Sequence, residues 1–145
     1  MKQQLPEEAL QNLNVSSKAG REAWKNGDTK GAEHFFLEAW AAIPEPKNEY
    51  DYTQSLSRGF VIFYRDTKQF EKAKEWLNLM RIAYGHETVP SEYVDFIAAT
   101  VYFEAGEFDS AFRIFDAQFK KYKGRPFQGE DKKYLDFYKN RAAGG

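Results

Sequence analysis

The segment AGREAWKNGDTKGAEHFFLEAWAAIP, residues 19–44, predicts two helices joined by a tight turn. From Ala32 onward, apolar residues recur at intervals of three and four, which is the period of one face of a helix. Asn26-Gly27-Asp28 interrupts this pattern. Gly27 suits the end of a helix because glycine adopts positive φ without a Cβ clash. The segment therefore predicts an antiparallel helix pair.

Two later segments have the same organisation, FVIFYRDTKQFEKAKEWLNLMRIAYG at 60–85 and AATVYFEAGEFDSAFRIFDAQFKKYK at 98–123. Ala32, Ala73 and Ala111 align in the three segments, so the repeat step is about 40 residues. One pair leaves an apolar face uncovered, so repeated pairs are expected to stack. The predicted fold is all-α, an α-solenoid of about three antiparallel helix pairs in a single domain. We expect the pairs at about 13–44, 54–85 and 92–123, a short helix from Pro6, a capping helix at about 129–142 and a flexible tail at 142–145.

Each pair contains small and large apolar residues of the types a helical repeat uses: Gly20, Gly27, Ala32 and Phe36 in the first, Tyr64, Phe70, Ala73 and Leu77 in the second, and Ala99, Gly106, Ala111 and Phe115 in the third. Over residues 13–123 this pattern resembles the tetratricopeptide repeat family. Two helices approach closely where small residues meet, so Gly20 is expected opposite Ala32, with Phe36 filling the space toward the next pair. Val61 departs from the pattern, and the repeat step is longer than the family's period of about 34 residues. A helical repeat with a period near 40 is the competing fold.

Composition argues against several function classes. The chain has 145 residues, no Cys and a net charge of −1, which excludes disulfides and thiolate metal sites and does not favour wholesale nucleic-acid binding. The chain has no basic start followed by a long apolar run and no apolar stretch of the roughly 20 residues needed to cross a bilayer. We expect a soluble, cytoplasmic protein.

Catalysis is not expected from this sequence. His34 and Glu38 stand one helical turn apart, but a metal site needs three or four converging ligands. His86 lies in a polar loop, and the glycines form no phosphate-binding motif. We therefore predict no enzyme activity, no cofactor and no metal ion.

The preferred function is binding of a partner protein or peptide. The resemblance implies that the first helix of each pair lines a concave face. The predicted partner-binding residues are Ser17, Arg21, Trp24 and Lys25, then Arg58, Ile62 and Arg65, then Tyr93, Phe96, Thr100 and Phe103, with Asn14 and Ser55 one turn earlier in their helices. Trp, Tyr and Arg are the types that dominate interface energetics. We expect an acidic partner segment with apolar anchors, as an adaptor, assembly chaperone or inhibitor would bind, and an apolar strip could also serve self-association. For each aromatic the alternative is packing inside the core.

The alternative function is nucleic-acid contact through the C-terminal segment. Residues 113–141 contain nine Lys or Arg against four Asp or Glu, and KKYKGRPF and KKYLDFYKNR interleave cations with aromatics. Such a pattern suits single-strand stacking. The preferred interpretation is a helix whose Tyr and Phe cover the last pair, because solenoids require terminal caps.

Overall fold

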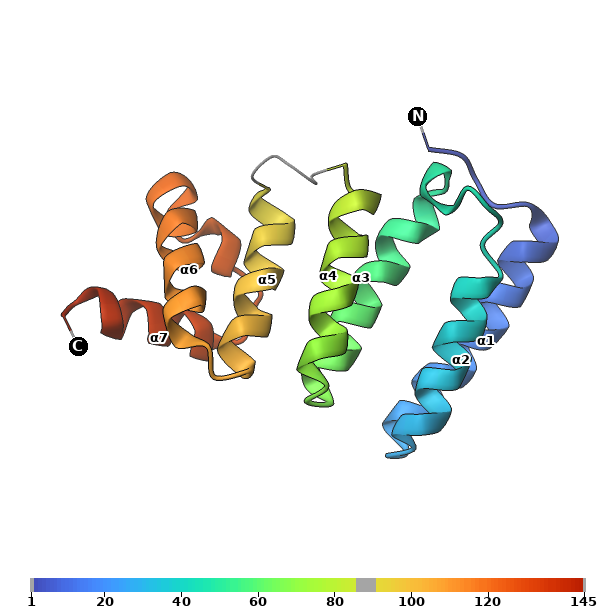
Figure 1. Cartoon of the computed structure of the whole chain (residues 1–145), viewed down its shortest axis with the longest axis horizontal. Helices are drawn as coiled ribbons and strands as arrows, with labels where there is room; N and C mark the ends of the chain where they lie inside the picture. The colour runs from blue at the N-terminus through green and yellow to red at the C-terminus, as the bar shows by residue number, and fades with distance from the viewer. Residues whose placement is uncertain (1, 86–90, 145) are drawn as a thin grey trace. The chain divides into compact units, whose positions relative to one another are not determined.

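The computed structural model describes residues 2–85 and 91–144, and within them the protein is all-α (Figure 1). The helices follow in chain order: α1 (Glu7–Lys25), α2 (Thr29–Ala41), α3 (Asp51–Asp66), α4 (Phe70–Ala83), α5 (Glu92–Glu104), α6 (Phe108–Tyr122) and α7 (Lys132–Ala142). Two short 3-10 helices are η1 (Lys47–Glu49) and η2 (Arg125–Phe127). The first six helices form consecutive antiparallel pairs, and α7 follows them. None of the helices in these described ranges combines the length and apolarity of a membrane span.

The chain divides into two compact units, residues 1–60 and 61–145, with the boundary inside α3. Unit 1 contains α1, α2 and the start of α3. Unit 2 contains the end of α3 and the helices from α4 to α7. The sequence pattern predicts a separate short helix from Pro6, but the structure has one continuous helix of 19 residues for which Pro6 is the N-cap.

The three turns within the helix pairs share one backbone geometry. The N–H groups of Asp28, Gln69 and Glu107 donate to the carbonyls of Ala23, Tyr64 and Tyr102, at 2.8, 2.8 and 2.9 Å. Residues with positive φ precede these donors: Gly27 at 81°, Lys68 at 62° and Gly106 at 80°. A bond of this span beside a left-handed residue is the Schellman ending of a helix. The turns recur at the same spacing as Ala32, Ala73 and Ala111, so the predicted spacing of the pairs is confirmed.

Small residues lie where the paired helices approach each other. Ala32, Ala73 and Ala111 are fully buried at the aligned position. At Gly20 a Cβ would come within 2.6 Å of the Phe36 ring. The ring of Phe36 therefore lies against α1 inside its own pair. It does not only fill the space toward the next pair, which was the expectation from the repeat pattern.

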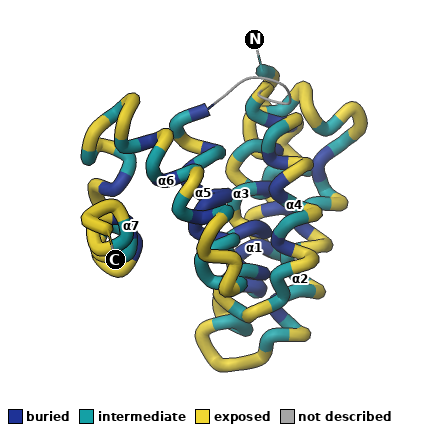
Figure 2. The backbone as a smooth tube through the Cα atoms, turned by 60° about the vertical axis from the view of Figure 1, so that its left-hand side comes forward, coloured by how far each residue is buried: buried dark blue, intermediate teal, exposed yellow. Residues whose placement is uncertain are grey.

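The core of unit 2 is largely aromatic. α5 is buried from Phe96 to Val101, as the dark stretch in Figure 2 shows. η2 and α7 complete this core by adding Phe127, Tyr134 and Tyr138, all buried. Tyr134 donates from its hydroxyl to Glu104 at 2.8 Å, and Tyr138 donates to Asp116 at 2.9 Å. Burial, followed by these hydrogen bonds to carboxylates, raises the pKa of both phenols.

Several predictions concern the ends and loops of the chain. The capping helix begins at Lys132, three residues later than the pattern suggests, because Asp131 caps it by accepting from the Lys133 N–H at 3.0 Å. Of the predicted flexible tail, Ala142 ends α7 and Gly145 lies outside the described residues. The predicted loop residue His86 also lies outside them.

Candidate partner-binding groove

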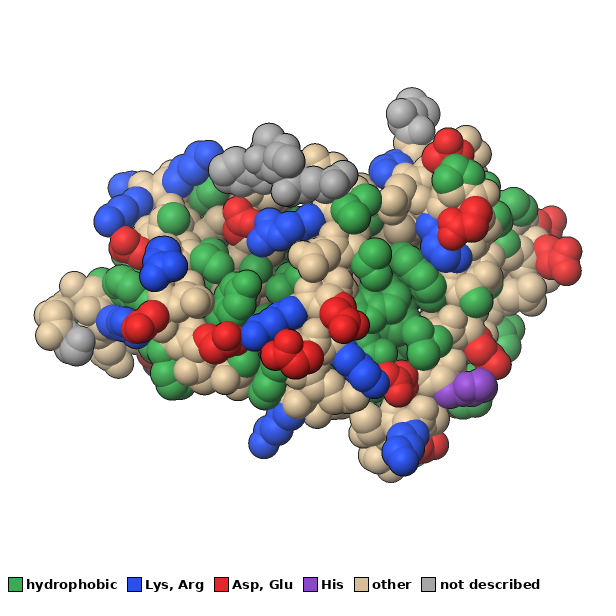
Figure 3. Space-filling model, in the orientation of Figure 1, with side chains coloured by type: hydrophobic (Ala, Val, Ile, Leu, Met, Phe, Trp, Pro, Cys, Tyr) green, Lys and Arg blue, Asp and Glu red, His purple; other side chains and the backbone are tan. Residues whose placement is uncertain are grey.

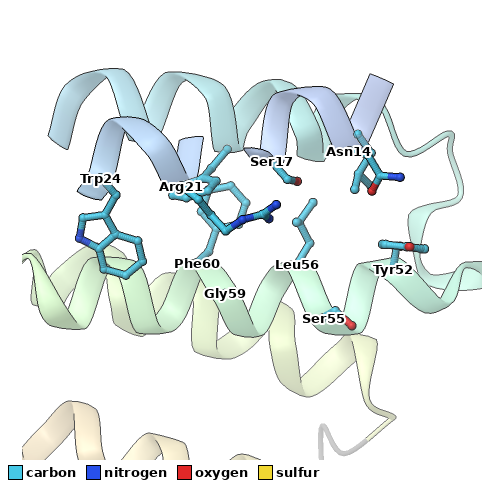
Figure 4. A pocket seen from close by; sticks show the side chains of 11 residues that line it. Asn14, Ser17, Arg21, Trp24, Tyr52, Ser55, Leu56, Gly59 and Phe60 are labelled. Atoms are coloured by element: carbon cyan, nitrogen blue, oxygen red, sulfur yellow. The ribbon is translucent and has the colours of Figure 1, made fainter. Parts of the chain in front are cut away.

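Unit 1 contains an open pocket of about 330 Å³ between α1 and the first half of α3, with one residue of α2 (Figure 4). We call it the unit 1 groove. Its lining is Leu13, Asn14, Ser17, Arg21, Trp24, Phe36, Tyr52, Ser55, Leu56, Gly59 and Phe60. A volume of this size is at the lower end of the range for ligand sites. Trp24 lies at one end of the groove, and Asn14 and Tyr52 lie at the other.

Helical spacing explains which side chains reach the groove. Asn14, Ser17, Arg21 and Trp24 follow one another at steps of three and four, so they form one stripe along α1. Tyr52, Ser55 and Gly59 form the facing stripe on α3. The α1 stripe spans ten residue steps, or about 15 Å at the helical rise. An extended segment of about five residues would cover this length.

The aromatic wall of the groove is held by ring contacts. Phe36 packs edge-to-face on both Trp24 and Phe60, with centroids 6.3 Å apart in each case. Phe60 also meets Trp40 at 6.2 Å. Edge-to-face pairs at these distances are favourable, and they restrain the rings. The wall is therefore preformed by side chains of α1, α2 and α3.

Two polar side chains of the groove lining, Arg21 and Ser17, have no partner among the residues that the structure describes. The Arg21 side chain points into the space between α1 and α3, and its guanidinium forms no ion pair or hydrogen bond within residues 2–85 and 91–144. Ser17 is 7% exposed, and its Oγ is buried without a hydrogen-bond partner in the described part of the chain. A buried hydroxyl left unsatisfied costs about 1–3 kcal/mol. Among the eleven lining residues Arg21 is the single charged one.

Other arginines contrast with Arg21. Carboxylates pair with Arg65 (Asp66, 2.8 Å), Arg81 (Asp95, 2.6 Å), Arg125 (Glu92, 2.6 Å) and Arg141 (Asp109). On the face shown in Figure 3, basic and acidic side chains are interspersed, which suits this pairing. Within the described ranges, Arg21 thus lacks the carboxylate partner that these four arginines have.

The predicted binding residues separate into distinct environments. Ser17, Arg21 and Trp24 line the unit 1 groove together with Asn14 and Ser55. Lys25 is exposed on α1 outside the lining, Tyr93 is exposed at the start of α5, and Arg58 and Ile62 are half-buried on α3 outside the lining.

The remaining predicted residues are inside unit 2, which corrects the expectation that they line an open strip. Phe96 and Thr100 are buried. Phe103 packs on Tyr134 at 5.4 Å and on Phe137 at 5.0 Å, so α7 covers it. The Arg65 side chain is 14% exposed and donates to Thr100 Oγ1 at 2.9 Å. These four side chains hold α3, α5 and α7 together within unit 2.

The sequence pattern did not predict that three residues of α3 line the groove: Tyr52, Gly59 and Phe60. A glycine inside an apolar helix was the available signal, because glycine costs about 1 kcal/mol relative to Ala there. A Cβ at Gly59 would meet no atom within 4 Å, so its backbone borders open space.

The other candidate sites have ordinary surroundings. His34 is 66% exposed and lies 3.1 Å from Glu38, and no group of three potential metal ligands occurs in the part of the chain that the structure describes. In the basic C-terminal segment, Phe127, Tyr134 and Tyr138 are buried, so these rings are not available for base stacking.

Comparisons with models of protein families, with curated proteins and with solved structures gave no match, so the groove is interpreted from its own geometry.

Proposed function

We propose that this protein is a helical-repeat module of the tetratricopeptide type that binds a segment of another protein in the unit 1 groove. The observation that carries the proposal is Arg21, which has no partner in the described part of the chain, inside an otherwise uncharged, aromatic-walled groove. An apolar surface with a few convergent polar groups is the usual form of a binding site. The repeated Schellman turns support the repeat assignment. The repeat step of about 40 residues is longer than the family's period of about 34.

The groove has the length and openness for a peptide segment. Its α1 stripe runs about 15 Å, and Asn14, Arg21, Ser55 and Gly59 on its rim are exposed to solvent. Phe36 and Trp24 are half-buried, so a bound side chain would remove more of their surface from water. Apolar burial contributes about 25 cal/mol per Å². An exposed groove of this kind supports binding, and we propose no chemical step in it.

A comparative capture experiment tests the proposal. Wild type, Gly59→Trp and Ala117→Trp are immobilised and exposed to native lysate, and the bound proteins are quantified by mass spectrometry. Gly59→Trp places a large ring in the groove without a steric barrier at its Cβ. Ala117 is exposed on α6 outside the groove, so Ala117→Trp adds the same side chain elsewhere.

We expect proteins that bind wild type and Ala117→Trp and that are lost with Gly59→Trp. Equal thermal melts of the three proteins provide the folding control. If the three proteins capture the same set in the same amounts, the groove does not bind a partner and the proposal is wrong.

A further inference from the structure

The helix pairs α1–α2 and α5–α6 carry different side chains at one pair of aligned positions. When the helix pairs are aligned at Ala32 and Ala111, Ser17 corresponds to Phe96, and Phe36 corresponds to Phe115. In both units a ring of the helix that follows the pair contacts this Phe. Phe60 of α3 packs on Phe36 in unit 1, and Tyr134 of α7 packs on Phe115 at 6.0 Å in unit 2.

In unit 2 the space beside Phe96 and Phe115 is filled by aromatic rings. η2 packs the ring of Phe127 against both Phe96, at 5.0 Å, and Phe115, at 5.3 Å. Tyr138 adds a further contact to Phe127 at 6.1 Å. The pair α5–α6 thus buries its face by taking up an aromatic side chain from a short segment outside the pair.

In unit 1 the aligned residues Ser17 and Phe36 line the groove. Ser17 stands in place of the Phe96 ring, and Gly59 places no side chain over the opening. The space that remains still has aromatic walls, from Trp24, Phe36 and Phe60. Its shape and chemistry therefore match an aromatic side chain supplied from outside, as Phe127 is supplied in unit 2.

The polar groups add a second requirement. Arg21 has no carboxylate partner among the described residues, and it lies one turn from Ser17, whose hydroxyl is also unsatisfied. A carboxylate accepts charge-assisted hydrogen bonds from a guanidinium, and Arg21 is exposed to solvent. No lining residue carries negative charge to repel it.

From these observations we infer that the groove recognises a segment of a partner protein in which an aromatic residue stands close to an Asp or Glu. The aromatic side chain enters between Trp24, Phe36 and Phe60, and the carboxylate pairs with Arg21. This inference rests on the proposed function, because it specifies the chemistry of the segment that the groove binds.

The test is a selection from a phage library of random 12-residue peptides. Wild-type protein is the bait, and Gly59→Trp is used to remove peptides that bind elsewhere. The expected result is a set of groove-dependent peptides enriched in an aromatic residue within four positions of Asp or Glu. One synthetic peptide is then measured against Arg21→Gln and Lys25→Gln. Lys25 is exposed on the same helix outside the groove, so it is the matched loss of charge.

We expect Arg21→Gln to weaken binding of this peptide roughly 3- to 10-fold, in the range of a charge-assisted hydrogen bond, and Lys25→Gln to weaken it less than about 2-fold. Groove-dependent peptides without the aromatic and acidic pair would overturn the inference and leave the proposed function standing. Equal effects of the two substitutions would overturn the role of Arg21. A selection with no groove-dependent peptide would overturn both the inference and the proposed function.

Discussion

Replacing Ser17 with Ala should stabilise the protein, because the hydroxyl of Ser17 is buried without a hydrogen-bond partner in the described part of the chain. Removing such a group recovers part of a desolvation cost of about 1–3 kcal/mol. Alanine also has the higher helix propensity. Ser16 is the matched control, since it is the neighbouring helical serine and is half-buried. Both substitutions gain helix propensity, so the difference between their free energies of unfolding reports the effect of the buried Ser17 hydroxyl.

We expect Ser17→Ala to raise the free energy of unfolding by about 1–2 kcal/mol more than Ser16→Ala. For a chain near 150 residues this corresponds to roughly 2–8 °C in Tm. Urea denaturation followed by far-UV circular dichroism gives the free energies, and a thermal melt gives Tm. Equal stabilisation by the two substitutions would show that the Ser17 hydroxyl finds a partner in solution, and the argument from its isolation would fail.

Three further substitutions test the surrounding structure. Lys68→Gly should raise the free energy of unfolding by about 0.5–1 kcal/mol in urea denaturation, because Lys68 has a φ of 62° that glycine adopts without a Cβ clash; no gain would contradict the turn geometry. Arg65→Glu should lower the free energy of unfolding by about 2–4 kcal/mol, since it puts a carboxylate beside Asp66 in a largely buried place. Arg21→Glu should leave the free energy of unfolding within about 0.5 kcal/mol of wild type. Equal losses at the two arginines would contradict their separation into packing and binding roles. Tyr134→Phe should cost about 0.5–1.5 kcal/mol at neutral pH through the lost bond to Glu104. The folded pKa of Tyr134 is raised, so this tyrosine stabilises the fold fully below its unfolded pKa near 10 and loses that contribution as pH rises from there through the folded value. The difference in urea midpoint between wild type and Tyr134→Phe should therefore shrink from about pH 9 to about pH 11. A difference that stays constant over this range would refute the argument.

The helices and their turns could be predicted from sequence because both depend on local spacing. Apolar residues at three- and four-residue intervals locate the helices, and Gly27 and Gly106 mark two of the turns by their positive φ. The same reasoning placed Ser17, Arg21 and Trp24 on one stripe, and all three line the groove. A stripe on a single helix follows from its period alone.

The rest of the candidate site depends on contacts between distant residues. Phe96 and Thr100 occupy the same stripe positions as Ser17 and Arg21, yet they are buried by packing within unit 2. Arg65 meets Thr100 across 35 residues of sequence. The rotation of α3 about its axis decides that Gly59 faces the groove while Arg58 does not line it. That rotation depends on how side chains interdigitate, which the period of one helix does not determine.

The contrast between the units also explains why one groove remains open. Helix pairs related by the same repeat present the same aromatic wall, Phe36 in unit 1 and Phe115 in unit 2. Closing that wall needs a ring, which unit 2 obtains from η2 as Phe127. Unit 1 has Ser17 at the wall and Gly59 at the rim, and both leave the space free at a cost to stability. Residues that lower stability and keep a preformed pocket accessible are expected where binding is selected over packing. Ser17→Phe should therefore keep or raise the free energy of unfolding while it abolishes capture of the groove-dependent peptides, and a large loss of stability would show that the space is not available to a ring.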